Sequence, residues 1–144
     1  MIADRIMSDQ QAGLAILSVI GNAPQQGFAE RGDGFRRFAA LWRLHGGMMA
    51  AIHPVLGATS AWPDPVAAAS ELQREVEMLA DDLAAREARE DERWRPDFLR
   101  LQTAFDQLCR IEQLELLPLI LALPPDRQAR LAALVPDRGR AMEA

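Results

Sequence analysis

The sequence contains a single cysteine and no long apolar run, and each shortage excludes a class of protein. Cys109 alone cannot form an internal disulfide, and its isolation favours a reducing compartment. No apolar run reaches the roughly 20 residues that a membrane-spanning helix requires. The first ten residues, MIADRIMSDQ, lack the basic region of a signal peptide, and no small-residue cleavage site follows them. We therefore expect a cytoplasmic protein with no membrane partner.

Basic clusters and strand patterns are also missing. The net charge is −5 and no block of arginine or lysine stands out, which argues against nucleic acid as a partner. No run alternates Val, Ile or Thr with polar residues, and no Asn-Gly turn is present, so sheet structure is not predicted. The chain has 144 residues, of which 49% are hydrophobic and 26% charged, a balance typical of one soluble globular domain.

Apolar residues recur at helical spacing along most of the chain. The pattern predicts four long helices and a short fifth one, over residues 3–20, 35–54, 65–94, 96–123 and 126–135. Four amphipathic helices of similar length favour an all-α fold, an antiparallel up-down four-helix bundle with a short C-terminal helix. We assign residues 1–123 to the bundle and 124–144 to the short helix and tail, which is amphipathic enough to dock on the bundle or on another chain.

The helix ends follow from local signals. The cluster Gly21-Asn22-Ala23-Pro24 ends the first helix, and the polar, glycine-rich stretch QQGFAERGDG (25–34) is predicted to be a linker. Asp64 is placed to cap the third helix, with Pro65 in its first turn. The charged stretch REAREDERW (86–94) is expected to protrude into solvent. Pro118 is expected to kink or loosen the last turns of the fourth helix.

One polar residue interrupts the apolar stripe of each long helix. Glu112 stands in the fourth stripe, where a leucine is expected; the other members are Phe98, Leu101, Phe105, Leu108, Leu116 and Leu119. The first stripe is Ala3, Met7, Gln10, Leu14 and Leu17, the second contains His45, and the third contains Gln73. In an up-down bundle such positions meet at one level, so we expect Glu112 to face His45, with Gln10 and Gln73 nearby. Gln11, beside Gln10, leaves the first register open by one residue.

The order of these segments resembles the bacterial hemerythrin-like (HHE cation-binding) family, a four-helix bundle that holds a di-iron centre. The segments that carry the resemblance are SDQQAGLAIL (8–17), MMAAIHPVL (48–56), QREVEMLADDL (73–83) and CRIEQLELLPLI (109–120). In that family the helices supply histidines and His-x-x-x-Glu motifs as iron ligands. The resemblance extends from about residue 2 to residue 123.

The departures from the family pattern fall on the iron ligands. Gln10 (or Gln11), Gln73 and Leu108 stand where the family has histidines. On the second helix, alignment by the stripe keeps His45 but replaces the glutamate with Met49. Alignment backward from Pro54 puts Leu44 and Met48 at these places and loses both ligands.

Two protein ligands cannot hold a di-iron site. We therefore expect no metal, no cofactor and no enzymatic activity. The core polar remnant would be Gln10, His45, Gln73 and Glu112, with Glu112 paired to His45 or protonated. The resemblance then implies a regulatory or protein-interaction module that contacts another protein or a second copy of itself.

Two alternatives remain open. The first is a residual mononuclear iron or oxygen-sensing site that uses His45 and Glu112, with His53 or water completing the shell. The second is a small-molecule or haem pocket, for which Gly46 and Gly47 in the middle of a helix would leave room. Close helix packing also explains these two glycines, each of which costs about 1 kcal/mol relative to alanine in a helix.

Overall fold

The computed structural model describes residues 2–22, 28–57, 64–85 and 94–134, and every regular element in these ranges is helical. The elements are α1 (Ile2–Asn22), α2 (Phe28–Leu56), α3 (Pro65–Ala85), α4 (Trp94–Ile111), the π-helical turn η1 (Glu112–Leu116), α5 (Leu117–Leu121) and α6 (Pro125–Leu134). The predicted all-α class is confirmed. None of the helices in these ranges is long and apolar enough to cross a membrane.

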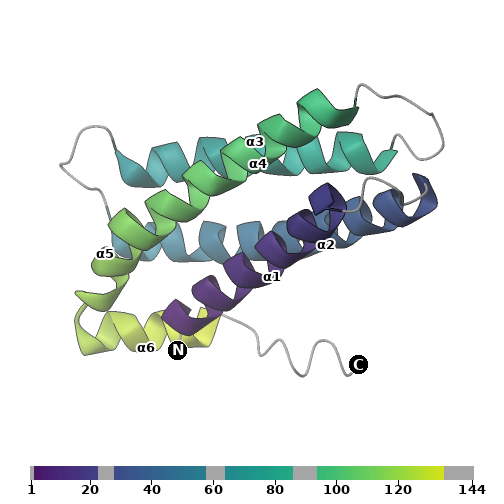
Figure 1. Ribbon diagram of the computed structural model, residues 1–144. Coiled ribbons are helices and arrows are strands. Elements are labelled where there is room, and N and C mark those ends of the chain that lie inside the picture. The colour runs from purple at the N-terminus through teal and green to yellow at the C-terminus, as the bar shows by residue number, and fades with distance from the viewer. Residues whose placement is uncertain (1, 23–27, 58–63, 86–93, 135–144) are drawn as a thin grey trace.

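The long helices pack as neighbours in chain order. α2 contacts both α1 and α3, and α3 contacts both α2 and α4. Each of the two middle helices therefore packs against two long neighbours. Figure 1 shows α1 and α2 in the lower half of the view and α3 and α4 in the upper half, with α5 and α6 gathered at one end. α6 packs against α2, and its Leu131 is completely buried. The predicted short C-terminal helix is therefore present and lies on the other helices.

The start of α2 differs from its prediction. The helix begins at Phe28 rather than Phe35, so most of the expected linker (25–34) is helical. Gly34 in this stretch has a packing role, because a Cβ atom there would lie 2.8 Å from Cγ1 of Ile20 on α1. Gly34 thus lets α2 approach α1 closely. Glycine disfavours a helix through its backbone freedom, but here a tertiary contact favours it inside one, so the predicted linker is wrong at this position.

Two other helix ends agree with their local signals, whereas α4 begins at Trp94, a residue predicted to end the third helix, two residues before the predicted start at Pro96. α3 begins at Pro65, and the side chain of Asp64 accepts a hydrogen bond from the backbone N–H of Val66 at 3.0 Å, as expected of an N-cap. α1 extends to Asn22, within the predicted breaker cluster. Most of the charged stretch 86–94 lies outside the described residues.

The fourth helix changes geometry before Pro118, as predicted. α-Helical hydrogen bonds stop at Ile111, and the backbone N–H of Leu117 donates to the carbonyl of Glu112, an i+5 pattern that widens the turn. Pro118 cannot donate a backbone hydrogen bond, and its ring would clash with the carbonyl one α-turn before it. The wider turn carries Glu112 as its first residue. Ile120, rather than the predicted Leu119, is the buried residue after Leu116.

The first stripe is rotated relative to its prediction. Leu14 is 58% exposed, whereas Ile6, Leu17 and Ile20 are buried. Gly13 takes the inner position, because a Cβ atom there would lie 3.0 Å from the ring of Phe105. In contrast, the stripe of α2 is buried throughout its predicted length; its members are Phe35, Phe38, Trp42, His45, Met49 and Ile52.

The two adjacent glycines in the middle of α2 allow a matched test of close packing. A Cβ atom at Gly46 would lie 2.5 Å from Nε2 of Gln73, which donates to the carbonyl of Trp42, whereas a Cβ atom at Gly47 meets nothing within 4 Å. We expect Gly47→Ala to raise the free energy of unfolding by about 0.5–1 kcal/mol through helix propensity. Gly46→Ala should displace Gln73 and be less stable than Gly47→Ala by about 1 kcal/mol or more. Urea denaturation measures both, and equal stabilisation would show that Gly46 has no packing role.

Candidate functional site

Four polar side chains lie in the centre of the molecule with almost no contact with solvent. Asp9 and Gln10 come from α1, His45 from α2 and Glu112 from η1, and their exposed fractions are 1%, 4%, 1% and 1%. Polar groups at this depth are costly unless they are hydrogen-bonded to one another. All four side chains are hydrogen-bonded to another member of this group.

His45 is held between two carboxylates. Its Nδ1 lies 2.9 Å from Oδ2 of Asp9, and its Nε2 lies 3.0 Å from both carboxylate oxygens of Glu112. A carboxylate in its ionised form can only accept hydrogen bonds, and opposite two such groups each ring nitrogen donates. A ring that donates from both nitrogens is the positively charged imidazolium.

The pKa of His45 agrees with this charge state. Burial on its own lowers the pKa, but the hydrogen bonds and negative charges of Asp9 and Glu112 outweigh it and raise the pKa from 6.5 to about 9. His45 is therefore charged at neutral pH. Trp42 stacks on it, with ring centroids 4.2 Å apart and planes 20° from parallel, which places an indole face over the cation.

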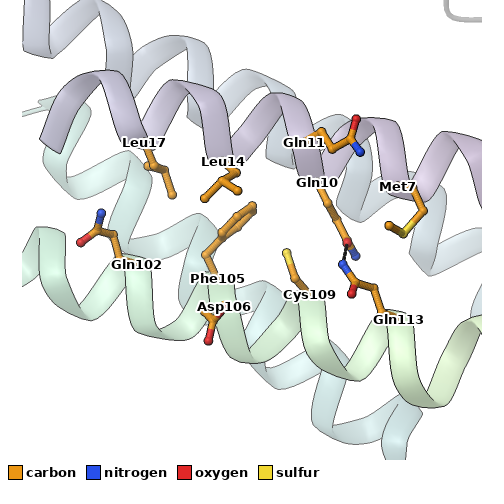
Figure 2. A pocket seen from close by; sticks show the side chains of 10 residues that line it. All are labelled: Met7, Gln10, Gln11, Leu14, Leu17, Gln102, Phe105, Asp106, Cys109 and Gln113. Atoms are coloured by element: carbon orange, nitrogen blue, oxygen red, sulfur yellow. Dashed lines mark hydrogen bonds between the residues drawn. The ribbon is translucent and has the colours of Figure 1, made fainter. Parts of the chain in front are cut away.

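The network extends from this centre toward the surface on two sides. Nε of Arg5, whose side chain is 23% exposed, lies 3.6 Å from Oδ1 of Asp9. On the other side Gln10 donates to Glu112 at 2.9 Å and accepts a hydrogen bond from Gln113 (Figure 2). Arg5, Asp9, His45 and Glu112 alternate in sign, so their formal charges sum to zero. Alternation of this kind lets charged groups stay buried together.

The structure brings together three of the four polar residues named from the sequence. Gln10, His45 and Glu112 meet, whereas Gln73 is half-buried and donates instead to the backbone carbonyl of Trp42 at 3.0 Å. Gln73 has no hydrogen bond to Gln10, His45 or Glu112, so the prediction that it joins them is wrong. Its position beside Gly46 directs it along α2 instead.

The two registers left open on α2 are resolved by burial. Leu44 is 64% exposed and His45 faces the core. The alignment that counts back from Pro54 would place Leu44 on the inner face, and it does not fit the structure. His53, proposed as an additional ligand, lies 3.3 Å from the hydroxyl of Ser70, and burial lowers its pKa. It has no hydrogen bond to His45 or Glu112 among the described residues.

Sequence reasoning missed Asp9, Arg5 and Gln113. Asp9 was overlooked because the stripe was drawn through Met7 and Leu14, which puts Asp9 off the inner face. The spacing of Ile6, Asp9 and Gly13 carried the signal, since three- and four-residue steps place these side chains on one side of a helix. A carboxylate in that series, opposite a histidine on the next helix, indicates a partner for its second nitrogen.

The donor set does not fit an iron centre. A histidine binds a metal through a ring nitrogen lone pair, and both ring nitrogens of His45 are occupied by contacts with carboxylates at 2.9 and 3.0 Å. Cys109 offers no alternative, because burial and the nearby Glu112 and Asp106 raise the pKa of its thiol to about 12. Within the described ranges, no three His, Cys, Asp or Glu side chains are grouped to hold a metal ion.

Comparisons with models of protein families, with curated proteins and with solved structures find no match to this chain. The interpretation of the site therefore rests on its geometry and on the sequence pattern.

Proposed function

We propose that this chain is a hemerythrin-like protein in which a buried ion-pair network stands in place of the di-iron centre, and that it is a non-catalytic regulatory or protein-interaction module. The observation that carries the proposal is the double engagement of His45 by Asp9 and Glu112. A histidine in this state is neither a metal ligand nor a base. Both of its ring nitrogens instead contact carboxylates, and these contacts link α2 to α1 and η1.

The antiparallel four-helix bundle of the family is the architecture we propose for residues 1–123. It is supported by the packing of α2 against α1 and α3, and of α3 against α4, in chain order. The polar side chains in the core come from α1, α2 and the end of the fourth helix, which are elements that carry iron ligands in the family. In this chain the buried polar side chains are Asp9, Gln10 and Glu112, and they surround one histidine, His45.

The non-catalytic part of the proposal is supported by the state of the reactive side chains. His45 is charged and fully hydrogen-bonded, and the Cys109 thiol stays protonated at neutral pH, so neither is a base or a nucleophile there. Apolar side chains that remain on the surface support a role through contacts; among them Leu114 is 72% exposed and Leu44 is 64% exposed. The partner would be another protein or a second copy of the chain.

Metal analysis tests the proposal directly. We expect purified protein to contain iron far below one atom per chain and to show no charge-transfer absorption in air. EDTA should leave the melting temperature unchanged, because nothing in the core depends on a metal. Iron near one or two atoms per chain, or a fall of several degrees with EDTA, would contradict the proposal and favour the residual iron site. Light scattering of the same sample measures self-association.

A further inference from the structure

A half-open groove runs along the seam between α1 and α4. Its volume is about 360 Å³, and Figure 2 shows side chains from α1, α4 and η1 around it. The seam is open because α1 packs mainly against α2 while α4 packs mainly against α3. A groove of this size is at the lower end of the range for small-molecule sites, roughly 300–1,000 Å³.

The walls of the groove are mostly apolar. Leu14 and Phe105 lie at its middle, with Met7 toward one end and the thiol of Cys109 between the two helices (Figure 2). The pKa of that thiol, raised to about 12, keeps it neutral, so it behaves as a small apolar surface. Two sulfur atoms and an aromatic ring favour an aromatic occupant, since both sulfur and ring contacts are attractive to a second ring. Leu14, 58% exposed, would be covered by it.

The polar end of the groove is formed by two amides. Gln10 is hydrogen-bonded at both ends of its amide, because its Nε2 donates to Glu112 and its Oε1 accepts from Gln113. Gln113 is exposed and donates an N–H in that bond, and its carbonyl oxygen accepts no hydrogen bond from the described residues around the groove. A ligand with an N–H or O–H group can donate to that oxygen.

The charges around the groove select an uncharged ligand. Asp106 is the only Asp, Glu or Arg among the residues that line the groove, and it is exposed, with its carboxylate 3.4 Å from Arg110. Glu112 lies behind Gln10. An anion would meet these carboxylates without a cation to pair with, and a cation would find no unpaired carboxylate in the wall. The groove therefore compensates neither a negative nor a positive charge on a ligand.

We propose that this groove binds a small uncharged aromatic molecule that carries one hydrogen-bond-donating group, such as a carboxamide, directed at Gln113. The site goes beyond the proposed function and does not depend on it: the groove shares Gln10 and Gln113 with the network around His45, but binding in the groove requires neither the presence nor the absence of a metal. Metal analysis and ligand binding can therefore fail independently.

Three probes of equal size and different charge test the site. We expect 2-naphthamide, which is neutral, to bind at neutral pH at least about tenfold more tightly than 2-naphthoate or 2-naphthylmethylamine. Isothermal titration calorimetry on the full chain gives the three dissociation constants. In ¹⁵N spectra, the side-chain amide signals of Gln10 and Gln113 should shift on addition of 2-naphthamide.

Two variants locate the binding. Leu14→Trp fills the groove and should weaken 2-naphthamide binding at least about tenfold. Leu44→Trp adds the same side chain at a similarly exposed leucine on α2, away from the groove, and should leave binding unchanged. Because both leucines are exposed, both variants should fold, and their melting temperatures check this.

The proposal is overturned if 2-naphthamide does not bind at millimolar concentration, or if the naphthoate or the amine binds equally well. It is also overturned if the Gln10 and Gln113 amide signals stay fixed, or if the folded Leu14→Trp variant binds normally. A further result against it would be a dimer in solution that Leu14→Trp converts to a monomer. A second copy of the chain, rather than a small molecule, would then cover the groove.

Discussion

Raising the pH from about 6 to about 10 should remove about 3 kcal/mol of the free energy of unfolding. The folded state binds the His45 proton more tightly than the unfolded state, since the pKa of His45 is about 9 in the fold and 6.5 in the unfolded chain. The stabilisation is therefore fully present below pH 6.5 and is lost as the pH rises through 9. Urea denaturation across this range measures it.

The composition leaves few side chains that titrate in this pH range. The chain has no tyrosine and no lysine, so among side chains only His45, His53 and Cys109 titrate between about pH 6 and pH 10. The pKa of His53 is lowered, so its contribution to the free energy of unfolding changes only below pH 6.5. The raised pKa of Cys109 adds a loss above pH 9, and a Cys109→Ala background removes it.

The control for the pH experiment is His45→Gln in the same background. Gln does not titrate, so the variant should lack the loss of stability centred near pH 9 that the parent protein shows. If the parent protein also lacks this loss, His45 is not charged in the fold, and the network is not an ion-pair network.

Replacing His45 by leucine should lower the free energy of unfolding by about 3–5 kcal/mol, which is the second large effect that we expect. The change leaves two buried carboxylates, Asp9 and Glu112, without the cation between them. Proton uptake by either carboxylate would reduce the cost. Glu112→Gln keeps the shape and the hydrogen-bonding capacity and should have a modest effect. Arg43→Leu is the matched control at an exposed ion pair, since Arg43 lies 2.9 Å from Asp81 and such pairs contribute less than about 1 kcal/mol.

The order of rescue distinguishes a pair from a three-membered network. His45→Leu with Glu112→Leu should recover only part of the loss, because the Asp9 carboxylate remains buried without the His45 cation, with Nε of Arg5 3.6 Å away. Adding Asp9→Leu should recover more. A double-mutant cycle for His45 and Glu112 should give a coupling energy well above the error. Simple additivity would show that the two side chains do not interact.

Helix positions and inner faces could be read largely from the sequence. The cap at Asp64, the end of α1 and the short C-terminal helix depend on contacts within a few residues, which local sequence specifies. The inward direction of His45 and Glu112 follows from helical periodicity, since each stands among buried apolar residues at steps of three and four. The reasoning failed where glycine was treated as a breaker at Gly34, because its packing partner Ile20 lies on another helix.

The sequence by itself determined that the chain is helical and that a histidine and a glutamate face its interior, because both follow from the helical repeat. Only the tertiary structure decided what these two residues contact. The rotation of α1 depends on Gly13 fitting against Phe105, and this rotation turns Asp9 inward to His45. Gln73 points elsewhere for the same kind of reason, since it packs over Gly46 of a neighbouring helix. Such choices depend on the surface of another element, which no periodicity within a single helix encodes.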